Sequence, residues 1–231
     1  MRAQRQPSST NPLRDYFDAG EGPLVHKWLH YFDIYHQWFQ AWRDQPVTVL
    51  ELGVFHGGSL RMWRDYFGGQ ARIVGVDVDP RCAALADDRI EVHIGDQEDR
   101  EFLRRLRDEV GPIDIVIDDG GHSMRQQIVT FEELFSAVRA PGLYLVEDTH
   151  TSYWEEYGGE HLEPSSFIEY AKGWIDQLHA HHSRDLERLS VTDVTRWVAG
   201  LHFYDSVVVL EKREVPDPVV EKRGRPVFPE D

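Results

Sequence analysis

Residues 47–67 read VTVLELGVFHGGSLRMWRDYF, and this stretch decides the fold class of the chain. Its first part, Val47 to Leu52, has the apolar composition of a short strand, and a helix is expected from Ser59 to about Phe67. Glycines lie between the two, where they let the backbone approach a ligand closely because glycine has no side chain. The stretch therefore predicts a strand, a nucleotide-type loop and a helix in succession.

The same alternation of strand and helix continues along the chain. Further strands are expected at Arg72–Val76, Ile90–Ile94, Ile113–Ile117 and Leu143–Val146. Helices are expected at Arg81–Ala86, Asp99–Val110, Met124–Val138 and Ser165–His182. This alternation predicts an α/β fold with a doubly wound, mostly parallel sheet. Two last strands, Val198–Phe203 and Ser206–Glu211, predict an antiparallel hairpin at the end of that sheet.

The segments at the two ends of the chain differ from this pattern. Residues 1–24 are rich in Pro, Ser, Asp and Gly and are expected to form a tail, as is the proline-rich segment 215–231. Residues 25–214 are expected to form one domain. It begins with an aromatic helix over Val25–Trp42, where aromatic residues recur at steps of four and three. We expect this helix to pack on the sheet or on a second subunit; the alternative is a lid over the active site.

Composition disfavours several classes of function. The 231 residues carry a formal net charge of −16, which opposes binding to the phosphate backbone of DNA or RNA. No apolar run reaches the roughly 20 residues needed to cross a bilayer, and residues 1–12 lack the apolar core of a signal peptide. The single cysteine, Cys82, allows no intrachain disulfide, which suits a reducing compartment. We therefore expect a cytoplasmic protein that binds neither nucleic acid nor membranes.

The glycine loop has the spacing Gly53-x-x-x-Gly57-Gly58, with Glu51 two residues before its first glycine. This spacing resembles the first motif of class I S-adenosylmethionine methyltransferases. The strands that follow add polar residues in the order that such a cofactor site requires.

Asp77 ends the second strand, where a carboxylate can accept both ribose hydroxyls of an adenosyl group. Asp96 and Gln97 end the third strand and are candidates for contacts with adenine. The alternative is turn chemistry, since Asp is common in loops. The full set of candidate cofactor residues is Glu51, Gly53, Gly57, Ser59, Asp77, Asp96, Gln97 and Asp118.

Polar residues also follow the fourth and fifth strands: DDGGH at 118–122, and then Glu147 and Asp148. Because the carboxyl ends of parallel strands meet at one edge, we expect Asp119, Glu147 and Asp148 to lie together. Carboxylate oxygens are the ligands that Mg²⁺ prefers, and the remaining positions suit water and two acceptor oxygens, such as those of a vicinal diol. His122 is then the candidate general base that takes the proton of the acceptor hydroxyl.

Each motif alone also fits a structural role. Asp-Gly turns are common, and an acidic pair after a strand can cap the next helix. The metal site is favoured because both motifs follow consecutive strands of a sheet that already carries a glycine loop. Zinc is disfavoured because the cluster is rich in oxygen. No role is assigned to His56, His150 or the Tyr153-Trp154 loop.

These runs resemble the metal-dependent sugar O-methyltransferases of natural-product biosynthesis, among them the mycinamicin macrolide-sugar and rhamnosyl O-methyltransferases. The resemblance covers roughly residues 25–212. The runs that carry it are ELG at 51–53, GVDVDPR at 75–81, IGDQ at 94–97, IDDGGH at 117–122 and EDTHTSYW at 147–154.

The resemblance implies a Mg²⁺ ion held by Asp119, Glu147 and Asp148, with His122 as the general base. It also implies a homo-oligomer in which the aromatic N-terminal segment contributes to the substrate pocket. The chain departs from the family at Gly121, where Ser is common, and this difference concerns the orientation of the base.

The combined expectation is an S-adenosylmethionine- and Mg²⁺-dependent O-methyltransferase that acts on a hydroxyl of a sugar-bearing natural product or a similar small molecule. Two alternatives remain open. One is a cephalosporin hydroxylase-like enzyme on the same fold, and the other is a methyltransferase-like binding module without catalysis.

Overall fold

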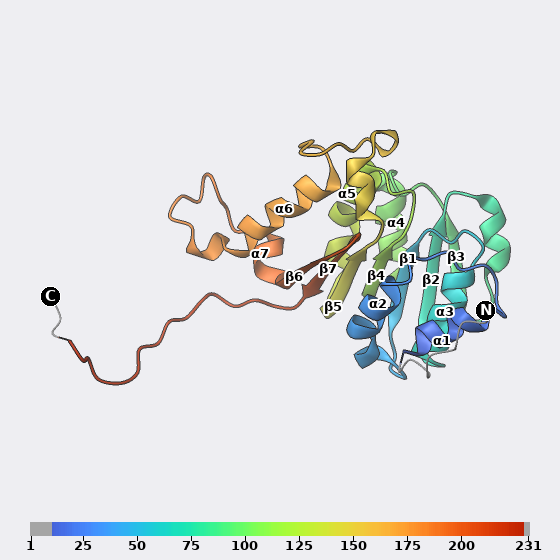
Figure 1. Cartoon of the computed structure of the whole chain (residues 1–231), viewed down its shortest axis with the longest axis horizontal. Coiled ribbons are helices and arrows are strands. Elements are labelled where there is room, and N and C mark those ends of the chain that lie inside the picture. Colours follow the sequence, from blue (N-terminus) through green and yellow to red (C-terminus); the bar gives the residue numbers. More distant parts are fainter. Residues whose placement is uncertain (1–10, 229–231) are drawn as a thin grey trace, which may run out of the picture.

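Seven strands form one sheet in the order β3-β2-β1-β4-β5-β7-β6, from right to left in Figure 1. The computed structural model describes residues 11–228. The strands are β1 (Thr48–Leu52), β2 (Arg72–Asp77), β3 (Ile90–Ile94), β4 (Ile113–Asp118), β5 (Val138–Val146), β6 (Val198–Tyr204) and β7 (Val207–Lys212). β1 to β5 pair in parallel, and β7 lies antiparallel between β5 and β6. The predicted parallel sheet and the antiparallel hairpin are both confirmed.

Helices cover both faces of this sheet (Figure 1). They are α1 (Pro12–Ala19), α2 (Tyr31–Phe39), α3 (Gly58–Phe67), α4 (Arg100–Val110), α5 (Met124–Leu134), α6 (Phe167–Leu178) and α7 (Asp193–Trp197). Short 3-10 turns are η1 (Gln40–Trp42), η2 (Pro80–Leu85), η3 (Phe135–Ala137), η4 (Thr149–Tyr153), η5 (Glu155–Tyr157) and η6 (Ala180–His182). α1, α2 and α3 contribute to the core on one face, and α4, α5 and α6 to the core on the other.

The central strands divide their side chains between these two cores. On β4, Ile115 and Ile117 lie in the core with α2 and α3, whereas Val116 lies in the core with α5. Neighbouring side chains of a strand point to opposite faces, so a strand covered on both sides needs apolar residues at every position. This explains why the central strands are mostly apolar, and it leaves polar residues to gather at their carboxyl ends.

The N-terminal tail expected over residues 1–24 is wrong for residues 12–19, which form α1. Asn11 caps this helix, since its side-chain oxygen accepts a hydrogen bond from the Leu13 amide at 3.1 Å. Pro12 occupies the first helical position and Gly20 ends the helix in a left-handed conformation. Leu13 is fully buried, so the folded body begins before residue 25; residues 1–10 lie outside the described part of the chain.

The aromatic segment forms a shorter helix than the Val25–Trp42 that was expected, because α2 begins at Tyr31. Residues 20–30 form neither helix nor strand, and Trp28 therefore precedes the helix and is 56% exposed. Phe32 and Phe39 on α2 are buried in the core with Trp63 of α3. The packing expected for this stripe is therefore confirmed for α2 itself.

Smaller differences lie at the ends of other elements. β5 begins at Val138 rather than Leu143, so the expected helix 124–138 ends earlier and continues as η3. The expected helix 81–86 is the 3-10 turn η2, and only Phe167–Leu178 of the segment 165–182 is α-helical.

Residues 213–228 have no helix or strand and run away from the sheet (Figure 1). This agrees with the extended segment expected from residue 215. Within residues 11–228, no helix is both long enough and apolar enough to cross a membrane.

Candidate active site

The glycine loop follows β1 and lies directly against the end of β4. Gly53 has a φ of +92°, and a Cβ atom there would lie 2.0 Å from the backbone oxygen of Asp119. Only glycine fits this approach. The Asp77 carboxylate accepts hydrogen bonds from the amides of Val54 at 2.8 Å and Phe55 at 2.9 Å, so it fixes the loop from the neighbouring strand.

A cavity of about 710 Å³ lies beyond the carboxyl ends of the parallel strands. This volume is in the range of small-molecule and cofactor sites. Of the candidate cofactor residues, Gly53, Asp77, Asp96 and Gln97 line the cavity. Asp119, His122 and Asp148 line the same cavity, so the glycine loop and the candidate metal site share one space.

Four candidate cofactor residues lie behind the cavity wall: Glu51, Gly57, Ser59 and Asp118. Glu51 is fully buried and accepts hydrogen bonds from Ser59 Oγ at 2.7 Å and Trp63 Nε1 at 3.0 Å. Asp118 is also fully buried. These carboxylates tie β1 and β4 to their neighbours, and direct contact between them and a cofactor stays a prediction.

Gln97 lines the cavity, but its amide group is already engaged. Its Nε2 atom donates to Asp118 and to Thr130, each at 3.1 Å, and its Oε1 atom accepts from the Gly121 amide at 2.8 Å. Gln97 therefore holds the loop after β4 in place. Its predicted contact with adenine would have to use atoms of the side chain other than these polar ones.

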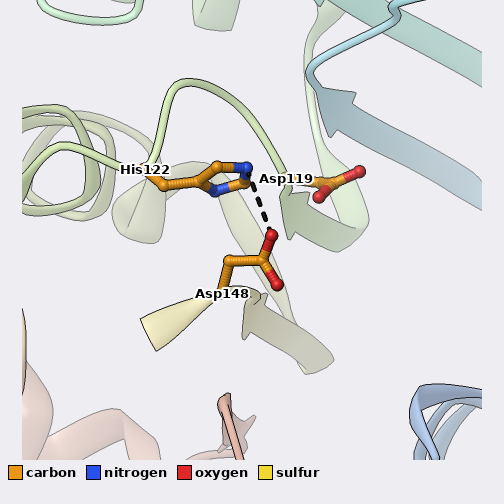
Figure 2. A group of neighbouring side chains, drawn as sticks. All are labelled: Asp119, His122 and Asp148. Atoms are coloured by element: carbon orange, nitrogen blue, oxygen red, sulfur yellow. Dashed lines mark ion pairs between the residues drawn. The ribbon is translucent and has the colours of Figure 1, made fainter. Parts of the chain in front are cut away.

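Asp119, His122 and Asp148 form a close group, drawn in Figure 2. One ligating atom from each residue lies within 4.8 Å of the others. His122 and Asp148 point toward one another, and Nε2 of His122 lies 3.5 Å from Oδ2 of Asp148. Both residues have positive φ, +58° for His122 and +51° for Asp148, although neither is glycine. The backbone is thus held in an uncommon conformation at both positions.

Glu147 does not belong to this close group, although it was expected beside Asp119 and Asp148. Its carboxylate is fully buried and is connected to Asp119 by the ammonium group of Lys27, which bonds to Asp119 and lies 2.8 Å from Oε2 of Glu147. Oε1 of Glu147 is buried without a hydrogen-bond partner. A buried carboxylate oxygen without a partner fits the oxygen-ligand preference of a hard divalent cation such as Mg²⁺.

Two residues of this site, Lys27 and Tyr31, were not predicted from the sequence. Lys27 lies in the segment before α2, and its bonding partners are 92 and 120 residues away, so no local pattern identifies it. Tyr31 is the first residue of α2, and its hydroxyl donates to Oδ1 of Asp148 at 2.6 Å. The aromatic periodicity of this segment could predict that Tyr31 is buried. It could not predict that the tyrosine hydroxyl bonds to Asp148.

Burial shifts the pKa values of the ionisable side chains in this site. It raises the pKa of Asp119 to about 7 and that of Glu147 to about 8, because desolvation disfavours the charged carboxylate. Burial lowers the pKa of His122 to about 4, so the imidazole is neutral at neutral pH. Burial alone would also lower the pKa of Lys27, but the adjacent carboxylates raise it above its ordinary value.

A second cavity of about 150 Å³ adjoins the carboxylates on the side of the aromatic segment. Its lining includes Trp28, Tyr31 and Glu147. The ring of His150 lies edge-on to Trp28, with centroids 6.0 Å apart, and 4.6 Å from the ring of Trp154. Partly exposed aromatic side chains therefore stand beside the candidate metal ligands.

Comparison with known proteins agrees with this geometry. Residues 50–149 match the family described as "Methyltransferase domain". The 8-demethyl-8-(2-methoxy-alpha-L-rhamnosyl)-tetracenomycin-C 3'-O-methyltransferase of Streptomyces olivaceus is 41% identical over 195 residues, which cover 80% of this chain and 50% of the relative. The mycinamicin VI 2''-O-methyltransferase of Micromonospora griseorubida is 37% identical over 220 residues, which cover 90% of this chain and 53% of the relative. The chain thus spans about half the length of the curated relatives it matches.

A solved structure extends the comparison to three dimensions. MycE methyltransferase from the mycinamycin biosynthetic pathway, in complex with Mg, SAH and mycinamycin VI, matches with a TM-score of 0.77 and 34% sequence identity. The match covers 91% of this chain and 54% of MycE. Residues 50–149 therefore match a methyltransferase domain, and the chain is similar to the sugar O-methyltransferases of tetracenomycin and mycinamicin pathways.

Proposed function

We propose that this protein is an S-adenosylmethionine- and Mg²⁺-dependent O-methyltransferase that methylates a hydroxyl of a sugar-bearing small molecule. One observation carries the proposal: the glycine loop and the group Asp119, His122 and Asp148 line the same cavity. The relatives named for methylation of sugars on tetracenomycin and mycinamicin support the class of acceptor.

Each part of the site has a role in this reaction. The glycine loop and Asp77 would hold the cofactor, and Asp119, Glu147 and Asp148 would hold the ion. A bound Mg²⁺ supplies Lewis acidity, which lowers the pKa of an acceptor hydroxyl.

The chain's own groups then orient the acceptor and move its proton. Nε2 of His122 accepts the proton of the hydroxyl as the oxygen forms its bond to the methyl carbon and the bond from carbon to sulfur breaks. The products are the methyl ether and S-adenosylhomocysteine. Alignment of oxygen, carbon and sulfur contributes up to roughly 7–11 kcal/mol in favourable cases.

The test is a methyl-transfer assay with labelled S-adenosylmethionine and a rhamnosylated polyketide that has free sugar hydroxyls. We expect labelled methyl ether on the sugar, loss of product with a chelator and recovery with added Mg²⁺. The matched control is the same polyketide without its sugar, which should remain unlabelled. A hydroxylated product would support the hydroxylase-like alternative, and binding of S-adenosylhomocysteine without methyl transfer to any glycosylated acceptor would support the binding module.

Two further expectations belong to this proposal. A homo-oligomer predicts a mass in light scattering that is a multiple of 26.9 kDa. A cytoplasmic location predicts recovery of the protein in the soluble fraction of its own cells. Both follow from the sequence and from the resemblance, and each has its own measurement.

A further inference from the structure

Lys27 enters the site from the segment between α1 and α2 that has no helix or strand. Its ammonium group bonds to Asp119, lies 2.8 Å from Oε2 of Glu147 and lies 3.9 Å from Oε1 of Glu51. The side chain is only 2% exposed. A buried cation is therefore built into the carboxylates at the ends of β1, β4 and β5.

These carboxylates have no other lysine or arginine partner within residues 11–228. The neighbours that can carry positive charge near Asp148 are His122 at 3.5 Å and His150 at 4.0 Å. Buried carboxylates without a cation repel one another and are costly to keep ionised. The charge of Lys27 is thus what allows Asp119 and Glu147 to lie close together inside the fold.

Parts of the fold outside the candidate metal ligands complete the pocket that receives the ammonium group. A Cβ atom on Gly58 would lie 2.2 Å from the backbone oxygen of Leu24, so the segment before Lys27 rests directly on the start of α3. The ring of Tyr35 lies 5.9 Å from the ammonium group. Glu51, which α3 holds by two hydrogen bonds, lies on the same side.

Lys27 uses one oxygen of Asp119 and one oxygen of Glu147, and it leaves the second oxygen of each carboxylate. It contacts Oδ2 of Asp119 and Oε2 of Glu147, whereas Oε1 of Glu147 has no hydrogen-bond partner. A carboxylate can bind an ammonium group with one oxygen and a metal ion with the other. Lys27 and an ion can therefore be held at the same time.

We propose that Lys27 is a permanent positioning cation of the metal site: it stays bonded to Asp119 and Glu147 when a divalent ion is bound. The ion then uses the carboxylate oxygens that Lys27 leaves free. This inference rests on the metal site of the proposed function. The opposing arrangement is a placeholder, in which the ion displaces the ammonium group and takes its position.

The first experiment is a crystal structure of the full chain with Mn²⁺, which scatters anomalously and has the same preference for oxygen ligands. We expect the Lys27 ammonium group to remain within hydrogen-bond distance of Glu147 beside the ion. An ammonium group that has left both carboxylates overturns the inference and leaves the proposed function standing. A crystal without Mn²⁺ at these carboxylates overturns both.

The second experiment measures Mn²⁺ affinity by calorimetry for the Lys27→Ala variant, with propylammonium or 1-propanol added. We expect at least a tenfold loss of affinity, because Asp119 and Glu147 are no longer held together. Propylammonium should restore the affinity by filling the vacated pocket with a cation, and the neutral 1-propanol should not. The matched control is Lys172→Ala, which removes an exposed lysine paired with Glu169 and should bind Mn²⁺ normally.

Two results contradict the proposal in this second experiment. Unchanged or tighter Mn²⁺ binding by Lys27→Ala would mean that the ammonium group competes with the ion. Equal restoration by both additives would mean that Lys27 only fills space. Affinity for S-adenosylhomocysteine, measured in parallel, reports whether the variant is folded; if it is not, the Mn²⁺ structure of the unaltered protein decides.

Discussion

The two edges of the sheet each bury a lysine, and the surroundings of the two lysines are opposite. Lys27 lies at the carboxyl edge among carboxylates, which raise its pKa although burial alone would lower it. Lys212 ends β7 at the other edge and donates to the backbone oxygens of Phe135 at 2.7 Å and Ser136 at 3.3 Å. There burial lowers the pKa of the lysine to about 8, because carbonyl groups do not supply a full negative charge.

The same contrast is seen between two aspartates at opposite ends of β4. Asp114, near its start, accepts a hydrogen bond from the Thr48 amide at 2.8 Å and pairs with Arg139 at 3.2 Å. Asp119, just past its end, lines the large cavity and belongs to the group with His122. At the amino edge of the parallel strands, the charged groups therefore join neighbouring strands. At the carboxyl edge, there are more carboxylates than positively charged side chains to pair with them among the described residues. That excess is why the proposed metal site lies at the carboxyl edge.

Replacing Asp114 and Asp119 one at a time separates these roles most strongly. We expect Asp119→Asn to lower Mg²⁺-dependent turnover by about 10³-fold or more, since a metal ligand stabilises the transition state by several kcal/mol. Asp114→Asn should keep its turnover but lose about 1.5–3 kcal/mol of stability, measured by urea unfolding, because it weakens a charged hydrogen bond. Metal-stimulated turnover that survives in Asp119→Asn would remove the distinction between the edges.

The next largest effect is expected at His122. The variant His122→Gln should lower kcat by on the order of 10²-fold, with little change in KM for the acceptor, because a general base acts in the transition state. His93→Gln is the matched control: His93 lies on β3 and its neighbours are Glu91 at 4.0 Å and Glu109 at 3.7 Å. A loss that appears in KM instead of kcat would make His122 a binding residue.

The smallest effect concerns Lys212 and depends on pH. Its pKa is about 8 in the folded chain and near its ordinary value of 10.5 in the unfolded chain. Between these values the unfolded chain binds more protons at this residue, so the contribution of Lys212 to stability rises with pH across the window. Below pH 8 the buried charge costs stability. After discounting for solvent screening, we expect a change on the order of 1 kcal/mol.

The measurement compares urea unfolding of the wild type and Lys212→Met from pH 7.5 to about 10.5. The difference in unfolding free energy should move in favour of the wild type as pH increases. If the difference in unfolding free energy does not change with pH, the Lys212 ammonium group is solvated. The two edges of the sheet would then not differ in how they shift the pKa of a buried lysine.

Local sequence patterns were sufficient for the sheet and for the residues directly beyond its strands. The apolar runs of β4 and β5 are interrupted where the polar residues begin, so both the strands and the ends at Asp119 and Asp148 could be predicted. The hairpin of β6 and β7 followed from two short strands near the end of the chain. These elements could be predicted because each depends on residues that are neighbours in the sequence or that follow parallel strands at the same edge of the sheet.

The helix α1 was missed although its signals were present. Asn11 followed by Pro12 is a typical helix start, and Gly20 is a typical end. The polar composition of residues 1–24 outweighed these signals. What stabilises the helix is the burial of Leu13, and that depends on a core whose other members come from distant segments.

Local sequence patterns could not predict two features of the site. The first is that Gln97 bonds to other residues of the protein, and the second is that Lys27 reaches the carboxylates. Position at the end of β3 suggested a contact with a ligand for Gln97, but Asp118, Thr130 and the Gly121 amide already occupy its polar atoms. Whether a strand-end side chain faces a cavity or its neighbours depends on distances in the folded chain. Lys27 is the clearer case, since its partners Asp119 and Glu147 directly follow strands that lie about 90 residues or more further along the chain.

His122 and Asp148 face each other from backbone conformations that side chains of L-amino acids rarely adopt. Each such conformation carries an energetic cost of about 1–2 kcal/mol, which glycine would avoid. A mutation to glycine at either position would therefore remove the backbone strain together with the side chain, so the stability that it gains partly offsets the contacts that it loses.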